Sequence, residues 1–88
     1  MYRRMPLYFF DLYNDMNVRD DLGQDLPDFE AIRKCALKEA REMFAASATE
    51  QGKIDLRHHI KVRDEDGAEV HRIDFEDAVT VQRGGKPV

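Results

Sequence analysis

The sequence predicts an α+β domain of the order ββαββ, with one amphipathic helix packed on an antiparallel sheet built from two β-hairpins. Apolar residues alternate with period two near both ends of the chain and recur every three or four positions between them. Clusters of Asn, Asp and Gly separate these segments, and such clusters are typical of turns. A chain of 88 residues is enough for one domain with a single modest core.

The first predicted hairpin opens with an aromatic strand over residues 7–13, whose side chains favour β-structure. An Asn- and Asp-rich turn follows, because short polar side chains of this kind hydrogen-bond to the local backbone. Residues 18–22 then return as a second, more polar strand, which ends before Gly23 and Pro27. The sequence therefore predicts that the first two strands pair directly.

A single amphipathic helix is predicted from Asp28 to about Ser47, with Gly52 beyond its end. Asp28 is a suitable N-cap because its carboxylate can accept a hydrogen bond from the first turn. The residues expected to face the sheet recur at helical spacing: Phe29, Ile32, Ala36, Ala40 and Met43. We expect this stripe to provide the helical half of the core.

The second predicted hairpin joins residues 56–63 and 69–75 through a turn at 64–67. A four-residue loop would place Ile60 opposite His71. Residues 75–79 can add a short helical turn after the last strand. The inner face of this hairpin provides the sheet half of the expected core: Leu56, Ile60, Val62, Ile73 and Phe75.

The folded domain is predicted over residues 6–80, with an N-terminal extension at 1–5 and a disordered tail at 81–88. No run approaches the roughly 18 apolar residues of a membrane span, and no cleavage-site pattern of a secretory signal follows residues 5–10. Cys35 is the only cysteine, which excludes an internal disulfide. We therefore expect a small acidic protein of net charge −4, cytoplasmic and without membrane contact.

Several short segments, taken together, resemble a known family. They are Met5-Pro6-Leu7-Tyr8-Phe9-Phe10-Asp11, Asp21-Leu22-Gly23, Leu26-Pro27-Asp28, Glu30-Ala31 and Val62-Arg63-Asp64-Glu65-Asp66-Gly67. The set is similar to a family of short uncharacterised alphaproteobacterial proteins of the rhizobial type, which carry a domain of unknown function and open with Met-Pro-x-Tyr-Phe-Phe-Asp. The resemblance covers roughly residues 5–80 and implies the domain boundaries and the compartment. It implies no activity, cofactor or catalytic residue, and family members commonly have an apolar residue at the position of His71.

Two groups of residues have the chemistry of metal ligands. In the predicted register His58 and His71 lie diagonally on the inner face, either as the start of a metal site or as two imidazoles at the margin of the core. Six aspartates lie between positions 11 and 28, but neither Asp15 nor Asp21 starts a segment with the ligand spacing of a calcium loop. Turn and cap roles explain these aspartates more simply. We expect no metal site and no cofactor, and leave open whether the acidic segment 11–28 binds a cation.

No arrangement in the sequence predicts catalysis. Cys35 lies beside the apolar helix stripe, where a thiol usually behaves as a small buried hydrophobe. Without a nucleophile next to a base, we expect no enzyme and no catalytic residue, but a non-enzymatic interaction or regulatory module with an unknown protein partner. The alternative is a nucleic-acid-binding module that uses the basic stripe Arg57–Arg63 on one face of the third strand, which the net negative charge disfavours.

Self-association is the most concrete property that the sequence predicts. One helix covers one face of a sheet, so the aromatic set on the other face of the first strand would form an exposed apolar patch. A two-fold homodimer is the commonest way to bury such a patch. The alternative is that residues 1–5, or the segment after Phe75, fold over it. The candidate self-association residues are Leu7, Tyr8, Phe9, Phe10 and Tyr13.

Overall fold

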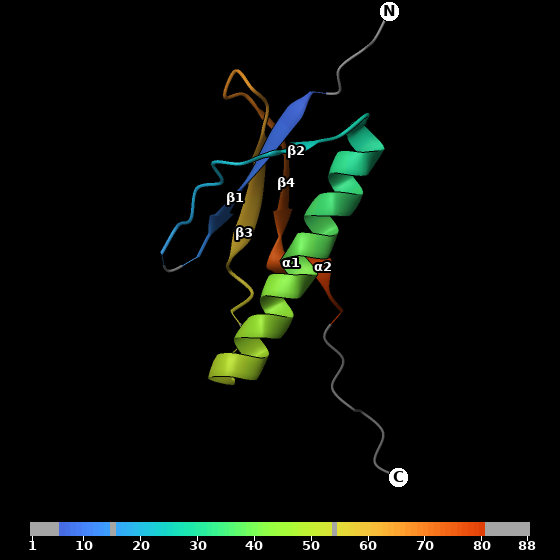
Figure 1. Ribbon diagram of the computed structural model, residues 1–88. Coiled ribbons are helices and arrows are strands. Elements are labelled where there is room, and N and C mark those ends of the chain that lie inside the picture. Colours follow the sequence, from blue (N-terminus) through green and yellow to red (C-terminus); the bar gives the residue numbers. More distant parts are fainter. Residues whose placement is uncertain (1–5, 15, 54, 81–88) are drawn as a thin grey trace, which may run out of the picture.

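The computed structural model describes residues 6–14, 16–53 and 55–80 and confirms the α+β class (Figure 1). The expected extension at 1–5 and the expected tail at 81–88 lie outside the described residues. One long helix packs on a four-stranded antiparallel sheet whose spatial order is β2-β1-β3-β4. The elements follow one another as β1 (Leu7–Tyr13), β2 (Gln24–Asp25), α1 (Phe29–Gln51), β3 (His59–Arg63), β4 (Glu69–Asp74) and α2 (Phe75–Ala78).

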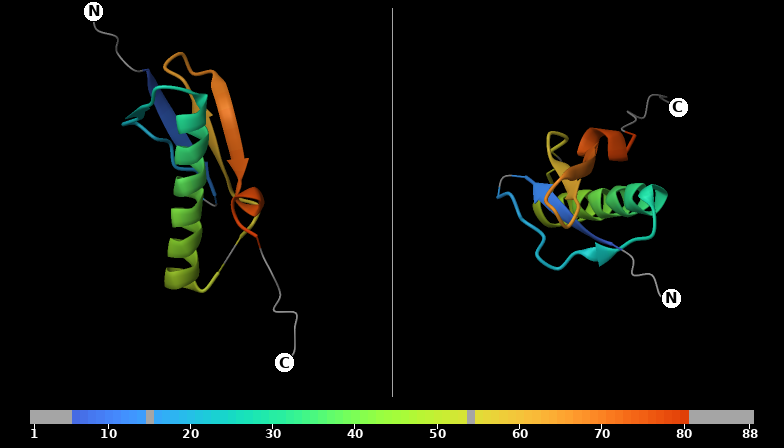
Figure 2. Two further views of the ribbon diagram at one scale, coloured as in Figure 1. Left: turned by 90° about the vertical axis from the view of Figure 1, so that its right-hand side faces the viewer. Right: turned by 90° about the horizontal axis from the view of Figure 1, so that it is seen from above.

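The centre of the sheet is the antiparallel pair β1–β3, in which Phe10 lies opposite Val62 and Leu12 opposite Ile60. Because side chains alternate along a strand, these four apolar residues point to the same face of the sheet. Helix α1 covers that face, and no helix of the described residues covers the opposite face (Figure 2). The period-two pattern of apolar residues in β1 and β3 therefore decides which side chains face the helix, as predicted.

The second strand is not where the sequence placed it. Residues 18–22 form no ladder with β1 beyond one isolated bridge between Leu12 and Val18, and β2 consists of Gln24–Asp25 alone. The physical reason is Asp20: its carboxylate accepts a hydrogen bond from the Phe10 N–H at 3.0 Å. A side chain thus takes the place of a backbone carbonyl at the outer edge of β1, and residues 19–23 follow that edge as a loop.

The register of the second hairpin also differs from the expected one. Ile60 lies opposite Ile73, and His71 lies opposite Val62, with an irregularity of the ladder between Val62 and Arg63. The turn is wider than assumed because one oxygen of the Asp64 carboxylate accepts from the backbone N–H groups of two later residues, Asp66 and Ala68. This turn moves the partner of Arg63 by one residue, from Ala68 to Glu69, and the irregularity between Val62 and Arg63 moves every later pair by one more. The predicted pairing of Ile60 with His71 is therefore wrong.

Helix α1 begins where the sequence predicts and ends later. The Asp28 carboxylate caps it by accepting from the Ala31 N–H at 2.8 Å. The helix continues through the alanine-rich residues 45–48, which favour helix strongly, to Gln51. Gly52 then ends it with φ 62°, a left-handed conformation that suits glycine, and its N–H donates to the Ala48 carbonyl at 3.0 Å.

The core lies between α1 and the face of the sheet that α1 covers. Helix α2 closes one end of the core, where the Ala78 carbonyl accepts a hydrogen bond of 2.8 Å from Arg41 Nε on α1. Most of the expected core residues belong to it, but Phe29 and Met43 are 54% and 41% exposed and Leu56 lies outside the buried cluster. Phe29 is the first residue of α1, where its ring meets that of His71 edge-on, and Met43 borders the open space between α1 and residues 18–24. The buried apolar residues are Phe10, Leu12, Ile32, Ala36, Ala40, Ile60, Val62, Phe75 and Ala78.

Candidate interaction surface

The five candidate self-association residues do not share one surface. Phe10 is buried beneath α1 and Tyr8 packs against the same core. Leu7, Phe9 and Tyr13 are half-buried and alternate to the opposite face of β1. An interface built from all five residues would therefore require α1 to leave the sheet.

The aromatic residues on the open face of the sheet have partners within the chain, contrary to expectation. The Arg63 guanidinium lies 4.5 Å from the centre of the Phe9 ring, and Gly23 lies so close to Phe9 that a Cβ there would be 2.9 Å from the ring. Tyr13 stacks on His59 with 4.9 Å between ring centres. The loop of the first hairpin thus lies over Phe9. The expected cover by residues 1–5 falls outside the described residues.

An ion pair between the buried Asp11 and the half-buried Arg63 fixes this loop to the sheet. Asp11 is 6% exposed, and its carboxylate accepts from Arg63 Nε at 2.7 Å and from the Asp20 N–H at 2.9 Å. Arg63 also donates to the Asp20 carbonyl at 2.9 Å. Burial raises the pKa of Asp20, but hydrogen bonds from the N–H groups of Phe10, Gly23 and Leu22 outweigh it and hold this pKa below its ordinary 3.8. The carboxylates of Asp11 and Asp20 therefore already accept hydrogen bonds from other groups of the chain.

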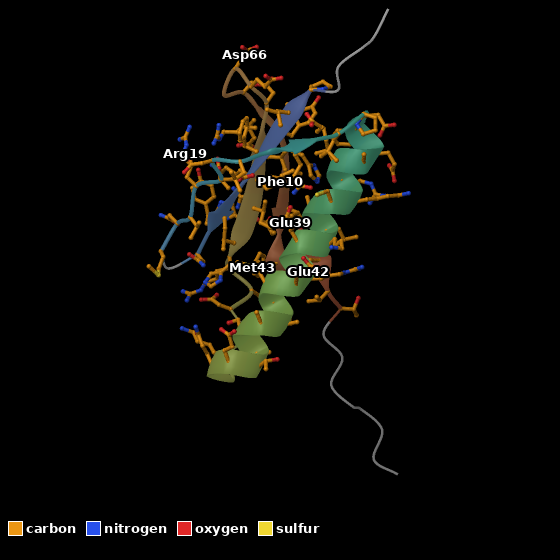
Figure 3. The ribbon with its side chains drawn as sticks, in the orientation of Figure 1. Phe10, Arg19, Glu39, Glu42, Met43 and Asp66 are labelled. Carbon is orange, nitrogen blue, oxygen red and sulfur yellow. The ribbon has the colours of Figure 1, made fainter. Side chains whose placement is uncertain are left out.

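A groove opens between this loop and helix α1 (Figure 3). It has a volume of about 570 Å³, and its floor is formed by the core residues Phe10, Leu12 and Ile60. Three apolar side chains stand at its rim and remain exposed: Val18 at 53%, Leu22 at 88% and Met43 at 41%. Single exposed apolar residues are ordinary on a protein surface, whereas several around one hollow mark an interaction site.

One end of the groove is tied to the helix by polar contacts. Gln24 Nε2 donates to Glu39 Oε2 at 2.6 Å, which joins β2 to α1. Arg19, Asp20 and Asp21 complete the polar part of the lining. Figure 3 shows Glu39 and Met43 on the helix and Arg19 on the loop, with Phe10 between them. The sequence did not reveal this groove, because Met43 fitted the core stripe and Val18 and Leu22 fitted a strand.

The pattern that characterises the DUF6894 family, a domain of unknown function, matches residues 7–76. The chain belongs to this family. The match begins with β1 and ends in α2, so the family's domain is the fold described above. The chain has no match among curated proteins and none among solved structures. In this DUF6894 domain, no helix of the described residues has the length and apolar content of a membrane span.

The histidines of the DUF6894 domain lie in separate environments. His58 precedes β3, with its Nε2 3.4 Å from Asp55 Oδ2 and its ring edge-on to Phe75 at 5.7 Å. His71 lies on β4 with its ring edge-on to Phe29 at 5.4 Å. The described residues contain no group of three His, Cys, Asp or Glu side chains placed to hold a metal ion. The diagonal pairing of the two histidines disappears with the shifted register.

We expect the free energy of unfolding to fall as the pH drops below about 6.5. Burial lowers the pKa of His71, and the positive charge of Arg33 lowers it further. Burial also lowers the pKa of His59, as do the charges of Arg72 and Lys61, whereas the negative charge of Asp74 opposes this shift. The folded state thus favours the neutral imidazoles, so the stability is complete above the unfolded pKa of 6.5 and is lost as the pH falls through the folded values.

Urea denaturation at about pH 7.5 and about pH 5.5 measures this loss. The matched variant is His71→Leu, which keeps an apolar side chain of similar size against Phe29 and removes one titrating group. Its pH dependence should be shallower than that of the wild type. Equal slopes for the two proteins would contradict the assignment to His71.

Cys35 is expected to react slowly with thiol reagents in the native DUF6894 domain. Burial raises the pKa of its thiol from 9.0 to about 11, and the nearby Glu39 carboxylate adds to this rise. The thiol donates to Gln24 Oε1 at 3.3 Å and lies 3.5 Å from Glu39 Oε2. Since the thiolate is the reactive form, labelling should accelerate markedly on unfolding in urea. Equal labelling rates in the two states would show that the thiol is activated instead.

The basic stripe Arg57–Arg63 is engaged in contacts within the chain. Arg57 Nη2 lies 2.8 Å from Asp55 Oδ2 in the turn before β3. On β3, Lys61 Nζ is 3.9 Å from Glu69 Oε1 and 5.0 Å from the centre of the Tyr13 ring, and Arg63 pairs with Asp11. A carboxylate thus lies beside each of these cations, which reduces the positive field that a phosphate backbone would meet.

Proposed function

We propose that this DUF6894 domain is a non-enzymatic interaction module that binds a polypeptide segment in the groove between residues 18–24 and α1. The observation that carries this proposal is the set of three exposed apolar side chains, Val18, Leu22 and Met43, around a hollow with an apolar floor. Leaving such side chains in water is unfavourable, and a small domain seldom retains a patch of them without use. The volume of the groove suits the insertion of one or two large side chains.

The environments of the two strongest nucleophiles support the non-enzymatic part of the proposal. The raised pKa of Cys35 keeps its thiol protonated near neutral pH. The Ser47 hydroxyl donates to the Lys53 carbonyl at 2.9 Å near the end of α1. Glu39 Oε2 lies 3.5 Å from the Cys35 sulfur, but its charge raises the pKa of the thiol and so disfavours the reactive thiolate. The backbone carbonyl that accepts from Ser47 is not a base that could take its proton.

Selection of random short peptides displayed on phage tests the groove. Peptides selected on the wild type should bind the double variant Leu22→Ser/Met43→Ser about 10-fold more weakly or worse, because each large apolar contact is worth about 1.5–3 kcal/mol. The matched control is Met16→Ser, since Met16 is 81% exposed but does not line the groove. Peptides that bind all three proteins equally, or no enrichment at all, would contradict the proposed function.

Self-association remains a prediction, and Met16, which is 81% exposed in the turn of the first hairpin, favours it. Because the other aromatic residues of β1 have partners in the chain, we expect two copies to meet at this hairpin end rather than along β1. Sedimentation equilibrium should then show a mass that rises above the monomer's 10.3 kDa with concentration. Met16→Ser should weaken the association, and a mass fixed near 10.3 kDa at all concentrations would exclude it.

Nucleic-acid binding through Arg57–Arg63 is the alternative function. The carboxylates beside these cations and the net charge of −4 make it the weaker candidate. An electrophoretic mobility shift at low and high salt distinguishes the two. A complex that forms at low salt and is lost in Arg57→Ala/Lys61→Ala would favour nucleic acid over a peptide.

A further inference from the structure

The two walls of the groove carry negative charge. Asp20, Asp21 and Glu39 line it, and Arg19 is the one basic residue of the lining. Asp20 is already occupied by backbone N–H groups. Within the described part of the chain, neither Asp21 on the loop wall nor Glu39 on the helix wall forms an ion pair. In the part of the chain that the structure describes, the groove is therefore an apolar slot between two carboxylates that form no ion pair. The charge of Asp21 acts on Arg63 only from a distance, where it helps to raise the pKa of that guanidinium.

This distribution of charge determines which kind of binding partner fits the groove. A second copy that inserted its own hairpin into the groove would bring its own Asp21 and Asp20 towards Asp21 and Glu39 of the first copy. Like charges at a closing interface disfavour association, and opposite charges favour it. An acidic peptide would meet the same repulsion. The complement of this surface is an apolar side chain flanked by positive ones.

Resting on the proposed function, we infer that the partner of the groove is a basic peptide segment of another protein. A Leu, Met or Phe side chain of that segment packs between Val18, Leu22 and Met43, above the floor of Phe10, Leu12 and Ile60. Lys or Arg residues on either side of this anchor pair with Asp21 and Glu39. The anchor supplies most of the affinity, and the carboxylates select the charge of the partner.

The composition of the selected peptides and the response to charge-removing variants test this inference. Peptides selected on the wild type should contain Lys or Arg next to Leu, Met or Phe. Their affinity should fall about 2- to 5-fold in Asp21→Asn and again in Glu39→Gln, as expected for exposed ion pairs. Raising the salt concentration should weaken binding to the wild type more than to the double variant Asp21→Asn/Glu39→Gln.

The matched control for these variants is Asp66→Asn, which removes the same charge from the turn between β3 and β4, away from the groove (Figure 3). Glu39→Gln retains an oxygen that can accept from Gln24, so β2 should stay joined to α1. Thermal unfolding of each variant checks that it is folded. Asp66→Asn should leave the affinity of the selected peptides unchanged.

Each outcome separates this inference from the proposed function. If the selected peptides are acidic or uncharged and lose affinity only in Leu22→Ser/Met43→Ser, the groove binds peptides but the basic partner is wrong. If Leu22→Ser/Met43→Ser has no effect, the groove itself is not the site and both are wrong. If the protein is a dimer that the same double variant dissociates, a second copy occupies the groove and the inference fails.

Discussion

Replacing Asp11 with alanine should lower the free energy of unfolding by about 3 kcal/mol, because the half-buried Arg63 guanidinium and the Asp20 N–H both lose their charged acceptor. Asp11 is 6% exposed, at the centre of the sheet, and holds both Arg63 and the backbone of Asp20. In Asp11→Ala the guanidinium remains between Phe9 and the loop without a carboxylate. Urea denaturation at neutral pH measures the loss.

The control for this prediction is Asp11→Leu/Arg63→Met, which removes both charges and keeps apolar volume. A buried ion pair replaced as a whole often costs little, so the double variant should recover much of the stability lost in Asp11→Ala. The loop should nevertheless loosen, because the Asp20 N–H and carbonyl lose their partners on the sheet. A loss under about 0.5 kcal/mol in Asp11→Ala would show that water already satisfies this pair.

Truncation of Ile60 to alanine should cost about 2–5 kcal/mol, as for other large-to-small changes in a core. Ile60 is 2% exposed and lies between Leu12 on β1 and Ile73 on β4, directly beneath α1. The alanine would leave a cavity between β1, β4 and α1, and these elements cannot easily move together to fill it. Thermal or urea unfolding gives the measurement.

The comparison variant for Ile60 is Leu22→Ala, which removes a similar side chain that is 88% exposed. We expect it to change stability by less than about 0.5 kcal/mol, as usual for surface positions. Equal losses in the two variants would mean that Leu22 is buried in solution, for example by a second copy. The pair therefore also reports on whether the groove is open in the free protein.

The sequence by itself determined helix α1, the strands β1 and β3 and the faces that they use. The Asp28 cap and the 3.6-residue stripe placed α1, because both signals depend only on neighbours along the chain. The alternation over residues 59–63 placed Ile60 and Val62 inside, and His59 and Lys61 on the opposite face. Local chemistry is enough to fix such features.

Only the tertiary structure decided the second strand, the register of the last hairpin and the groove. Phe10 and Asp20 are ten residues apart and Arg63 and Asp11 fifty-two, and the hydrogen bonds between them hold residues 19–23 as a loop outside the ladder. Met43 shares its helix face with buried alanines, yet it is 41% exposed because it borders the groove that residues 18–24 leave open beside α1. Each of these outcomes depends on contacts between residues that are far apart in the sequence, and a local sequence pattern does not specify such contacts.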